Sequence, residues 1–383
     1  MKTALVGAVL LVLGLAAWAF GILDGTEVLA LTDRIWPVLL FVVAITVVAE
    51  LADQAGVFQS IAGHAARLAR GRTVVLWLFV VLMAVVSTAF LSLDTTAVLL
   101  TPIVVVLARR IGVSPLPFAL TTVWLANTAS LFLPVSNLTN LLAEHRLGGV
   151  GPLGFVALSF WPALVGVIVP VVVLAMVYRR PLSGRFTVDA AAPASDRLLF
   201  VTSAVVLVLL LPLLVSGLPV WLPASAAALL LIAVTAWRNP RVLRFDLVPW
   251  QLVVLASGLF LSMAALHNVG LGAFLEQVAG TGDSPADLLR LSASAGVGAN
   301  LVDNLPAYLA LEPAATSPDR LIALLIGVNL GPLVTPWASL ATLLWHQRLT
   351  AMDVRISWTR YALLGLIVAP LTVVGATLAL AFL

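Results

Sequence analysis

The chain has 383 residues, of which 62% are hydrophobic and 10% are charged. A soluble domain carries roughly 25% charged residues, so this composition excludes a soluble enzyme. The pI of 9.9 does not indicate nucleic-acid binding, because the basic residues are one lysine and arginines in short segments between apolar runs. Cysteine is absent, which excludes disulfides, thiolate metal sites and cysteine-dependent catalysis.

Apolar runs that approach or reach the length needed to cross a membrane, about 20 residues, recur along the first half of the chain. We expect spans there at 4–23, 35–51 and 153–178, a loop at 24–34 and an amphipathic interfacial helix at 55–72. A cleaved signal peptide is the alternative for the first run. Two apolar arms, 73–93 and 95–110, meet at Leu93-Asp94-Thr95-Thr96, and an interrupted helix occupies 116–143.

A polar segment, 178–197, is predicted to be a linker between an N-terminal half at 1–177 and a C-terminal half at 198–383. The second half repeats features of the first. Trp36 to Gly56 and Trp250 to Gly270 are each 20 residues apart, and each pair bounds an apolar run. The remaining predicted segments are spans at 198–215, 220–237 and 357–381, arms at 286–302 and 305–311, and an interrupted helix at 320–345.

The two interrupted helices share a motif. NTASLFLPVSNLTNLL at 127–142 aligns with NLGPLVTPWASLATLL at 329–344, so that Asn127 meets Asn329 and Pro134 meets Pro336. Proline removes a backbone donor and clashes with the preceding turn, which frees backbone polar groups. Within a bilayer such groups are tolerated only where protein or a wet cavity satisfies them. Two broken helices at corresponding positions are typical of the binding site of a secondary transporter.

Arginine and lysine counts predict the orientation. With the N-terminus in the cytoplasm, 16 basic residues lie inside and four lie outside, namely Arg34, Arg146, Arg290 and Arg320. The two repeats then enter the membrane from opposite faces. The arm at 305–311 is about 10 Å long, far short of the ~30 Å hydrocarbon core, which favours a re-entrant hairpin. We therefore predict an all-α polytopic protein of the plasma membrane, with two inverted repeats that each contain a re-entrant hairpin and a discontinuous transmembrane helix.

The candidate binding residues are the polar side chains at the two hairpin tips and the two breaks. A charged residue at membrane depth is costly, so it normally faces a cavity or a partner. Helix capping is the alternative for the two aspartates, and helix-to-helix hydrogen bonding is the alternative for the small polar residues. We expect no metal site, catalytic arrangement or cofactor. The candidates are Asp94, Thr95, Thr96, Asn127, Thr128, Ser130, Ser136, Asn137, Asp303, Asn304, Asn329, Thr335 and Ser339.

Four stretches resemble the signature sequences of the arsenite permease family of the ion transporter superfamily. They are LDTTAVLLTPIV (93–104), NTASLFLPVSNLTN (127–140), VDNLP (302–306) and NLGPLVTPWASLATLLW (329–345). The resemblance implies export of arsenite or antimonite, driven by protons or the membrane potential, sometimes with an ATPase partner. It also implies that the tips at 94 and 303–304 and the breaks at 130–137 and 332–339 form the site.

The chain departs from the family at charged positions. The first tip usually reads Asn-Asp and here reads Leu93-Asp94, while the second usually reads Asn-Asn and here reads Asp303-Asn304. Both breaks usually open with Asp, which Asn127 and Asn329 replace, and Leu333 replaces a lysine.

Substrate and coupling ion therefore stay open between three functions. The first is proton-coupled export of a small inorganic solute, the second a sodium-coupled dicarboxylate or citrate carrier, and the third a sodium/proton antiporter. The expected partners are a small inorganic solute and the lipid bilayer, without nucleic acid. A homodimer and an ATPase partner also stay open.

The charge bias generates a testable topology. Because the chain lacks cysteine, single cysteines can be introduced at Arg185 and His145 and labelled with a membrane-impermeant thiol reagent from outside the cell. We expect labelling at 145 and none at 185. Labelling at 185 without labelling at 145 would contradict the orientation.

Overall fold

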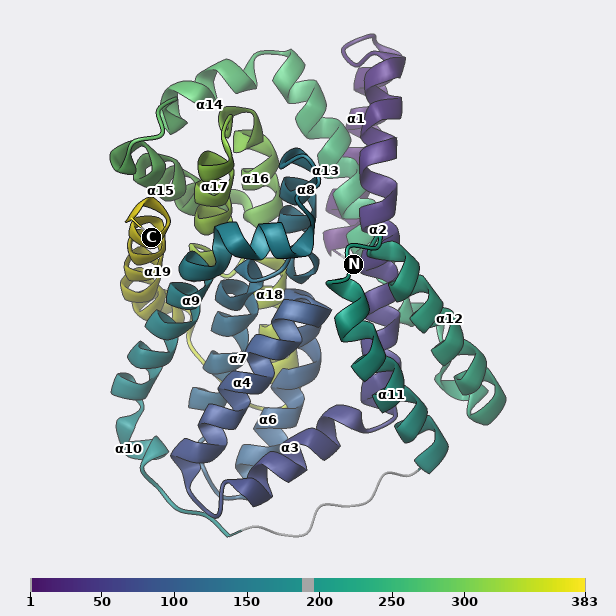
Figure 1. Cartoon of the computed structure of the whole chain (residues 1–383), viewed down its shortest axis with the longest axis vertical. Helices are drawn as coiled ribbons and strands as arrows, with labels where there is room; N and C mark the ends of the chain where they lie inside the picture. The colour runs from purple at the N-terminus through teal and green to yellow at the C-terminus, as the bar shows by residue number, and fades with distance from the viewer. Residues whose placement is uncertain (1, 188–195, 383) are drawn as a thin grey trace.

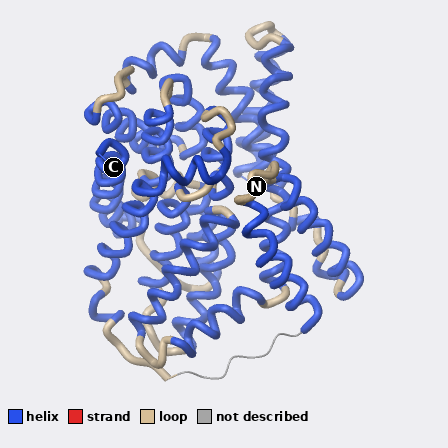
Figure 2. Tube along the Cα trace, viewed as in Figure 1, coloured by secondary structure: helices blue, strands red, loops and turns tan. Residues whose placement is uncertain are grey.

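The computed structural model describes residues 2–187 and 196–382, which are helical apart from loops and one isolated bridge between Arg72 and Arg185 (Figures 1 and 2). Within these two ranges, seven helices are long and apolar enough to cross a membrane. The structure thereby confirms the polytopic all-α class. The predicted linker at 178–197 opens with the short helix α10 (Arg179–Leu182), and its residues 188–195 lie outside the described part.

The helices of the first half follow the predicted order, with one correction. The predicted loop at 24–34 is helical, because Asp24 and Glu27 form a capping box that starts α2 directly at Gly25. The helices are α1 (Lys2–Ala19), α2 (Gly25–Gln54), α3 (Val57–Leu68), α4 (Thr73–Leu91), α5 (Leu93–Thr95), the π-helix η1 (Thr96–Leu100), α6 (Thr101–Arg110), α7 (Leu116–Thr128), α8 (Leu138–Arg146) and α9 (Gly151–Val177). Two 3₁₀ turns, η2 (Ala129–Leu131) and η3 (Pro134–Ser136), lie in the break between α7 and α8.

The second half adds two long helices and then repeats the same series. Its helices are α11 (Arg197–Leu214), α12 (Trp221–Arg238), α13 (Trp250–Asn268), α14 (Leu271–Ala279), α15 (Pro285–Val302), α16 (Asn304–Leu311), α17 (Pro318–Leu330), α18 (Leu340–Ala351) and α19 (Trp358–Phe382). Three 3₁₀ turns, η4 (Pro240–Val242), η5 (Phe245–Leu247) and η6 (Glu312–Ala314), complete the described elements.

The two broken helices correspond residue by residue. α7 and α17 have 13 residues each, and both α17 and α18 begin 202 positions after α7 and α8. The turns that precede the hairpins correspond as well, since Gly56 and Gly270 both adopt positive φ and start amphipathic helices, α3 and α14. α14 was not predicted from the sequence. Figure 1 shows the first hairpin, α4 to α6, rising from the lower end, and the second, α15 and α16, descending from the upper end.

Packing does not follow the division of the sequence at 178–197. α1 of the first half packs along α13 of the second, and α11 and α12 pack against α2. These five helices form one side of the molecule, which we call the side helices (right in Figure 1). The elements α3 to α10 and α14 to α19 form the rest, which we call the central bundle. The lower end of the bundle carries the arginines at the ends of α3, α6 and α10, and we call it the arginine-rich end.

Glycine permits the close contact between α1 and α13. A Cβ on Gly258 would lie 2.5 Å from the Gly7 carbonyl oxygen, which no side chain can occupy without moving the helices apart. Such overpacking typically costs about 1–3 kcal/mol.

We therefore expect Gly258→Ala to lower the midpoint of thermal unfolding in detergent. Gly272→Ala is a matched control, because its Cβ would meet the His267 ring at an ordinary 3.6 Å. Equal midpoints for the two variants would contradict the inferred contact.

Candidate functional site

Both hairpin tips place a residue other than glycine in a strained backbone conformation. Ser92 ends α4 with φ 99° and ψ 160°, and Asp303 ends α15 with φ 119° and ψ 158°. Only glycine adopts this region readily, and such strain concentrates at functional sites. The two residues are structural equivalents, so Asp94 lies two residues beyond the position in the first tip that corresponds to Asp303.

The two tip aspartates differ in their bonding. The Asp303 side chain caps α16 by accepting a hydrogen bond from the Leu305 N–H at 3.2 Å. In the first tip this capping role belongs to Ser92, whose hydroxyl accepts from the Thr95 N–H at 3.4 Å. Asp94 Oδ1 is buried and has no hydrogen-bond partner among the described residues. Helix capping therefore accounts in part for the presence of an aspartate at position 303, and it does not account for the aspartate at position 94.

The backbone freed at the first break is bound by an asparagine that sequence analysis did not single out. Asn140 donates from Nδ2 to the carbonyl of Ser130 at 2.6 Å and to that of Leu133 at 3.0 Å. The Ser136 hydroxyl joins the break to the first hairpin by donating to the Ala89 carbonyl at 3.0 Å. The break is thus satisfied within the protein, as the bilayer requires.

At the second break the freed backbone groups are bound by Asn300, which lies on the first arm of the second hairpin. Its Oδ1 accepts from the N–H groups of Val334 and Thr335, each at 3.1 Å, and its Nδ2 donates to the Gly331 carbonyl at 2.8 Å. Its own carbonyl accepts from the Thr335 hydroxyl at 2.7 Å and the Trp337 indole at 3.0 Å. Asn300 therefore fixes the second break to its hairpin.

A buried set of hydrogen bonds, which we call the amide clasp, joins the two broken helices to each other. Asn329 Oδ1 accepts from Asn137 Nδ2 at 2.8 Å and from the Thr139 hydroxyl at 3.0 Å. Asn329 Nδ2 donates to Asn140 Oδ1 at 2.7 Å. All four side chains are buried, so this clasp lies in the interior of the bundle.

The corresponding positions on the other side of the repeat leave polar atoms unpaired. The counterpart of Asn329 is Asn127, which lies 202 positions earlier. The counterparts of Asn137 and Asn140 are Ser339 and Thr342, which lie 202 positions later. Asn127 Oδ1, Ser339 Oγ and Thr342 Oγ1 are buried and lack partners among the described residues. Asn127 instead donates from Nδ2 to the Val123 carbonyl of its own helix, at 2.9 Å. The clasp is therefore closed on one side of the pseudo-symmetry only.

A small cavity of about 60 Å³ lies where the tips and the breaks meet. One wall is apolar and comes from the side helices, with Phe41 and Val42 on α2 and Leu252, Leu255 and Leu259 on α13. The opposite wall comes from the central bundle and combines apolar with polar side chains. Its polar residues are Ser92, Asp94, Asn137, Asp303, Asn304 and Ser339. Asp94 and Asp303 line the same small cavity.

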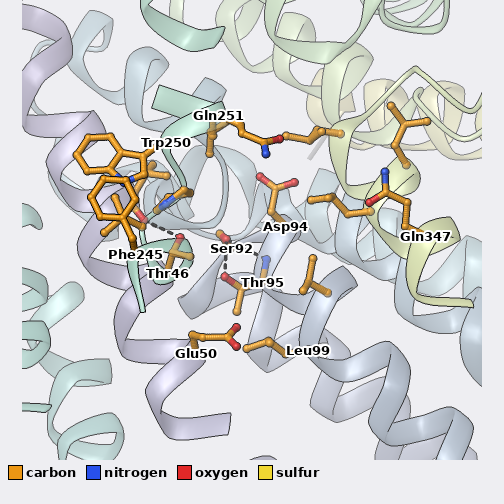
Figure 3. A pocket seen from close by; sticks show the side chains of 18 of the residues that line it. Thr46, Glu50, Ser92, Asp94, Thr95, Leu99, Phe245, Trp250, Gln251 and Gln347 are labelled. Carbon is orange, nitrogen blue, oxygen red and sulfur yellow. Dashed lines mark hydrogen bonds between the residues drawn. The ribbon is translucent and has the colours of Figure 1, made fainter. Parts of the chain in front are cut away.

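A cleft of about 1100 Å³ leads from Asp94 toward the arginine-rich end, between the side helices and the bundle. Figure 3 shows Asp94 between Gln251 of α13 and Gln347 of α18, with Glu50 of α2 further along the cleft. Glu50, near the C-terminal end of α2, lines this cleft. Sequence analysis missed both glutamines, because neither lies in a tip or a break.

The predicted site residues therefore divide into two groups. Asp94, Thr95, Asn137, Asp303, Asn304 and Ser339 line the small cavity or the cleft. The others line neither, and all of them except the half-buried Thr335 are buried. Of these, Thr96 bonds to Ser87 and Thr88 within the first hairpin, and Ser130 donates to the Asn127 carbonyl. Ser136 and Thr335 each join a break to a hairpin, and Asn329 belongs to the amide clasp. Asn127 and Thr128 have side-chain oxygens without a partner among the described residues.

Known proteins are similar to this sequence over almost its whole length. Residues 1–342 match the citrate transporter family. The arsenical pump membrane protein of Escherichia coli (strain K12) is 30% identical over 409 aligned positions, which cover 98% of this chain and 92% of that protein. The arsenical pump membrane protein of Yersinia enterocolitica is also 30% identical, covering 94% of this chain and 89% of its own length.

A solved structure shares the fold. The YdaH transporter of Alcanivorax borkumensis, described as having an unusual topology, superimposes with a TM-score of 0.61 over 99% of this chain and 97% of that chain. At 14% identity this likeness concerns the fold alone. Given the family match and the near-complete coverage of its relatives, the chain belongs to the citrate transporter family and to the arsenical pump membrane proteins.

Proposed function

We propose that this membrane transporter exports arsenite, antimonite or a related small inorganic solute from the cytoplasm in exchange for protons. The names of the E. coli and Yersinia relatives support the solute class. The observation that carries the proposal is the composition of the small cavity. Among its described lining residues there are two carboxylates and no arginine or lysine.

Charge argues against a carboxylate substrate. A dicarboxylate or citrate would bring two or more negative charges to a cavity that already holds Asp94 and Asp303. Buried like charges repel strongly unless cations compensate them. Arsenous acid, by contrast, is uncharged near neutral pH, and its three hydroxyl groups can donate to carboxylates and exchange hydrogen bonds with Asn137, Asn304 and Ser339.

Size points the same way. A water molecule needs roughly 10–15 Å³ of such a cavity, so 60 Å³ accommodates a solute of a few non-hydrogen atoms and is small for citrate. The wide cleft gives the solute a route from the arginine-rich end, which the positive-inside rule predicts to be cytoplasmic. Gln251 and Gln347, which offer amide donors and acceptors without charge, border that route.

The paired carboxylates supply a proton carrier. When both are ionised their repulsion is unfavourable, and it is relieved when either binds a proton. Export of a neutral solute moves no charge by itself, so uphill transport needs an ion that the protein binds in exchange. We infer that the Asp94–Asp303 pair takes up this proton from the outside as the solute leaves.

Purified protein in liposomes tests the substrate and the ion together. Arsenite, citrate, succinate and sodium fluxes are measured with and without a pH gradient or a sodium gradient. We expect arsenite flux that follows the pH gradient and no citrate or succinate flux. Citrate or succinate flux that depends on sodium would establish the carrier alternative, and sodium/proton exchange without solute would establish the antiporter.

A comparison of the two tips tests the assignment of Asp94. Asp94→Asn removes a carboxylate that caps nothing, so we expect transport to fall roughly tenfold or more while the thermal midpoint stays unchanged. Asp303→Asn keeps a residue that caps helices well, so this variant should also fold. Because it removes the second carboxylate, it should lose transport. Asp196→Asn, at the exposed cap of α11, is the control and should transport normally. Wild-type rates in Asp94→Asn would remove this carboxylate from the mechanism.

A further inference from the structure

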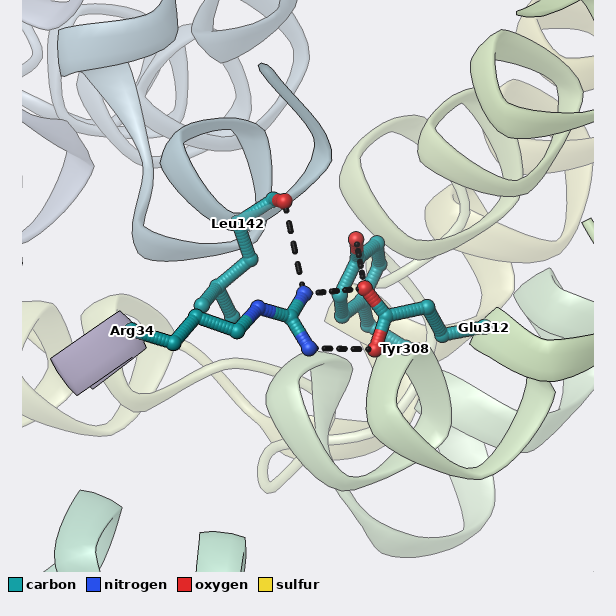
Figure 4. A network of polar contacts seen from close by, with 4 residues as sticks. All are labelled: Arg34, Leu142, Tyr308 and Glu312. Carbon is teal, nitrogen blue, oxygen red and sulfur yellow. Dashed lines mark hydrogen bonds and ion pairs between the residues drawn. The ribbon is translucent and has the colours of Figure 1, made fainter. Parts of the chain in front are cut away.

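A network of charged and polar groups joins the side helices to the central bundle at the end opposite the cleft (Figure 4). The Arg34 guanidinium, on α2, forms a two-pronged ion pair with the Glu312 carboxylate, which follows the second hairpin arm α16. It also donates to the Leu142 carbonyl of α8 at 3.4 Å, and the Tyr308 hydroxyl donates to Glu312 at 2.9 Å. One arginine therefore connects α2 to both a hairpin and a broken helix.

The pair is largely withdrawn from solvent. The Arg34 side chain is 19% exposed and the Glu312 side chain 9%, and Tyr308 is fully buried. Two-pronged arginine–carboxylate pairs are strong and demand a fixed geometry. Removing one partner would leave the other as a poorly solvated charge, so the pair resists separation unless the whole network moves apart.

The same helix borders the open cleft at its other end. Val42, Thr46 and Glu50 of α2 line the cleft, and Glu50 lies 16 residues beyond Arg34, about 24 Å along the helix. α2 is therefore separated from the bundle near the arginine-rich end and bound to it at the opposite end. The small cavity lies between these two regions, beside Phe41 and Val42.

We propose that the Arg34–Glu312 pair is the outer gate of the transport site, closed here while the cleft is open to the cytoplasm. This inference rests on the proposed transport function and on the orientation predicted from the arginine bias. Opening the cavity outward requires α2 to part from α8 and α16, and these are the elements that the pair holds together. The ion pair therefore breaks and re-forms once in each transport cycle.

Other arginines at this end do not connect the side helices to the bundle. Arg290 donates from Nε to the Val278 carbonyl at 2.8 Å, and Arg320 donates from Nε to the Ala314 carbonyl at 2.8 Å. Both bonds lie within the central bundle. Arg290→Gln is thus a matched control, because it removes an outer arginine without touching the connection between α2 and the bundle.

The test uses the cysteine-free chain with one reporter, Val42→Cys, whose side chain lines both the cavity and the cleft. A membrane-impermeant thiol reagent is applied from outside to intact cells, in the absence of solute. We expect Arg34→Gln and Glu312→Gln to raise the labelling rate at least tenfold over the parent, and Arg290→Gln to leave it unchanged. Arg34→Lys, which keeps the charge but not the two-pronged geometry, should give an intermediate rate.

Folded yield is measured by size exclusion for every variant, and Arg34→Lys serves if the glutamine variants do not fold. If folded variants label no faster than Arg290→Gln, the pair is not a gate and is a contact that persists throughout the transport cycle. Because this assay needs no solute, its result is independent of the flux panel. Failure to transport arsenite with normal gating would overturn the proposed function instead.

Discussion

The fold depends on one constraint, which is that backbone polar groups freed inside a bilayer must find partners within the protein. The protein meets it with the side chains of Asn140 and Asn300, each of which binds several backbone groups at a break. The two solutions differ in position. Asn140 belongs to the broken helix that it stabilises, whereas Asn300 belongs to the hairpin beside it. Asn300 consequently connects the second hairpin, whose tip carries Asp303, directly to the second break.

The first tip is placed by hydroxyl groups instead. Thr96 starts the π-helix η1 and donates to Ser87 at 2.8 Å, while Thr88 donates to Thr96 at 3.1 Å. These bonds hold the two arms of the hairpin together just behind Asp94. A π-helical turn widens the helix by one residue, and such turns are frequent at functional sites. The hydroxyls of this tip bond among themselves, whereas Asp94 lines the cavity and its Oδ1 has no hydrogen-bond partner among the described residues.

Much of this arrangement could be predicted from the sequence, and what could not has definite causes. Apolar length located the spans, and prolines located the breaks, because both signals are local. The capping box at Asp24 is also a local signal, but the segment 24–34 was predicted to be a loop because three of its eleven residues are acidic. The roles of Asn140 and Asn300 could not be predicted, because the sequence does not show whether an asparagine in an apolar helix binds a distant backbone group or a neighbouring one. For Asn329 the sequence left ligand binding and helix-to-helix hydrogen bonding open, and its hydrogen bond to Asn137 places it in the clasp.

The repeat accounts for the fold, and the departures from the repeat account for the site. If both halves were identical, each break would be closed by an amide clasp and each tip would be capped by its own strained residue. Substitution of Asn137 and Asn140 by Ser339 and Thr342 at the equivalent positions leaves buried oxygens that need water or another polar partner. Similarly, the first tip has Ser92 as its cap, which leaves Asp94 free as a second carboxylate beside Asp303. At the small cavity these departures leave Ser339 Oγ and Asp94 Oδ1 without hydrogen-bond partners among the described residues, so the asymmetry between the halves puts two unpaired polar atoms where we propose that the solute binds.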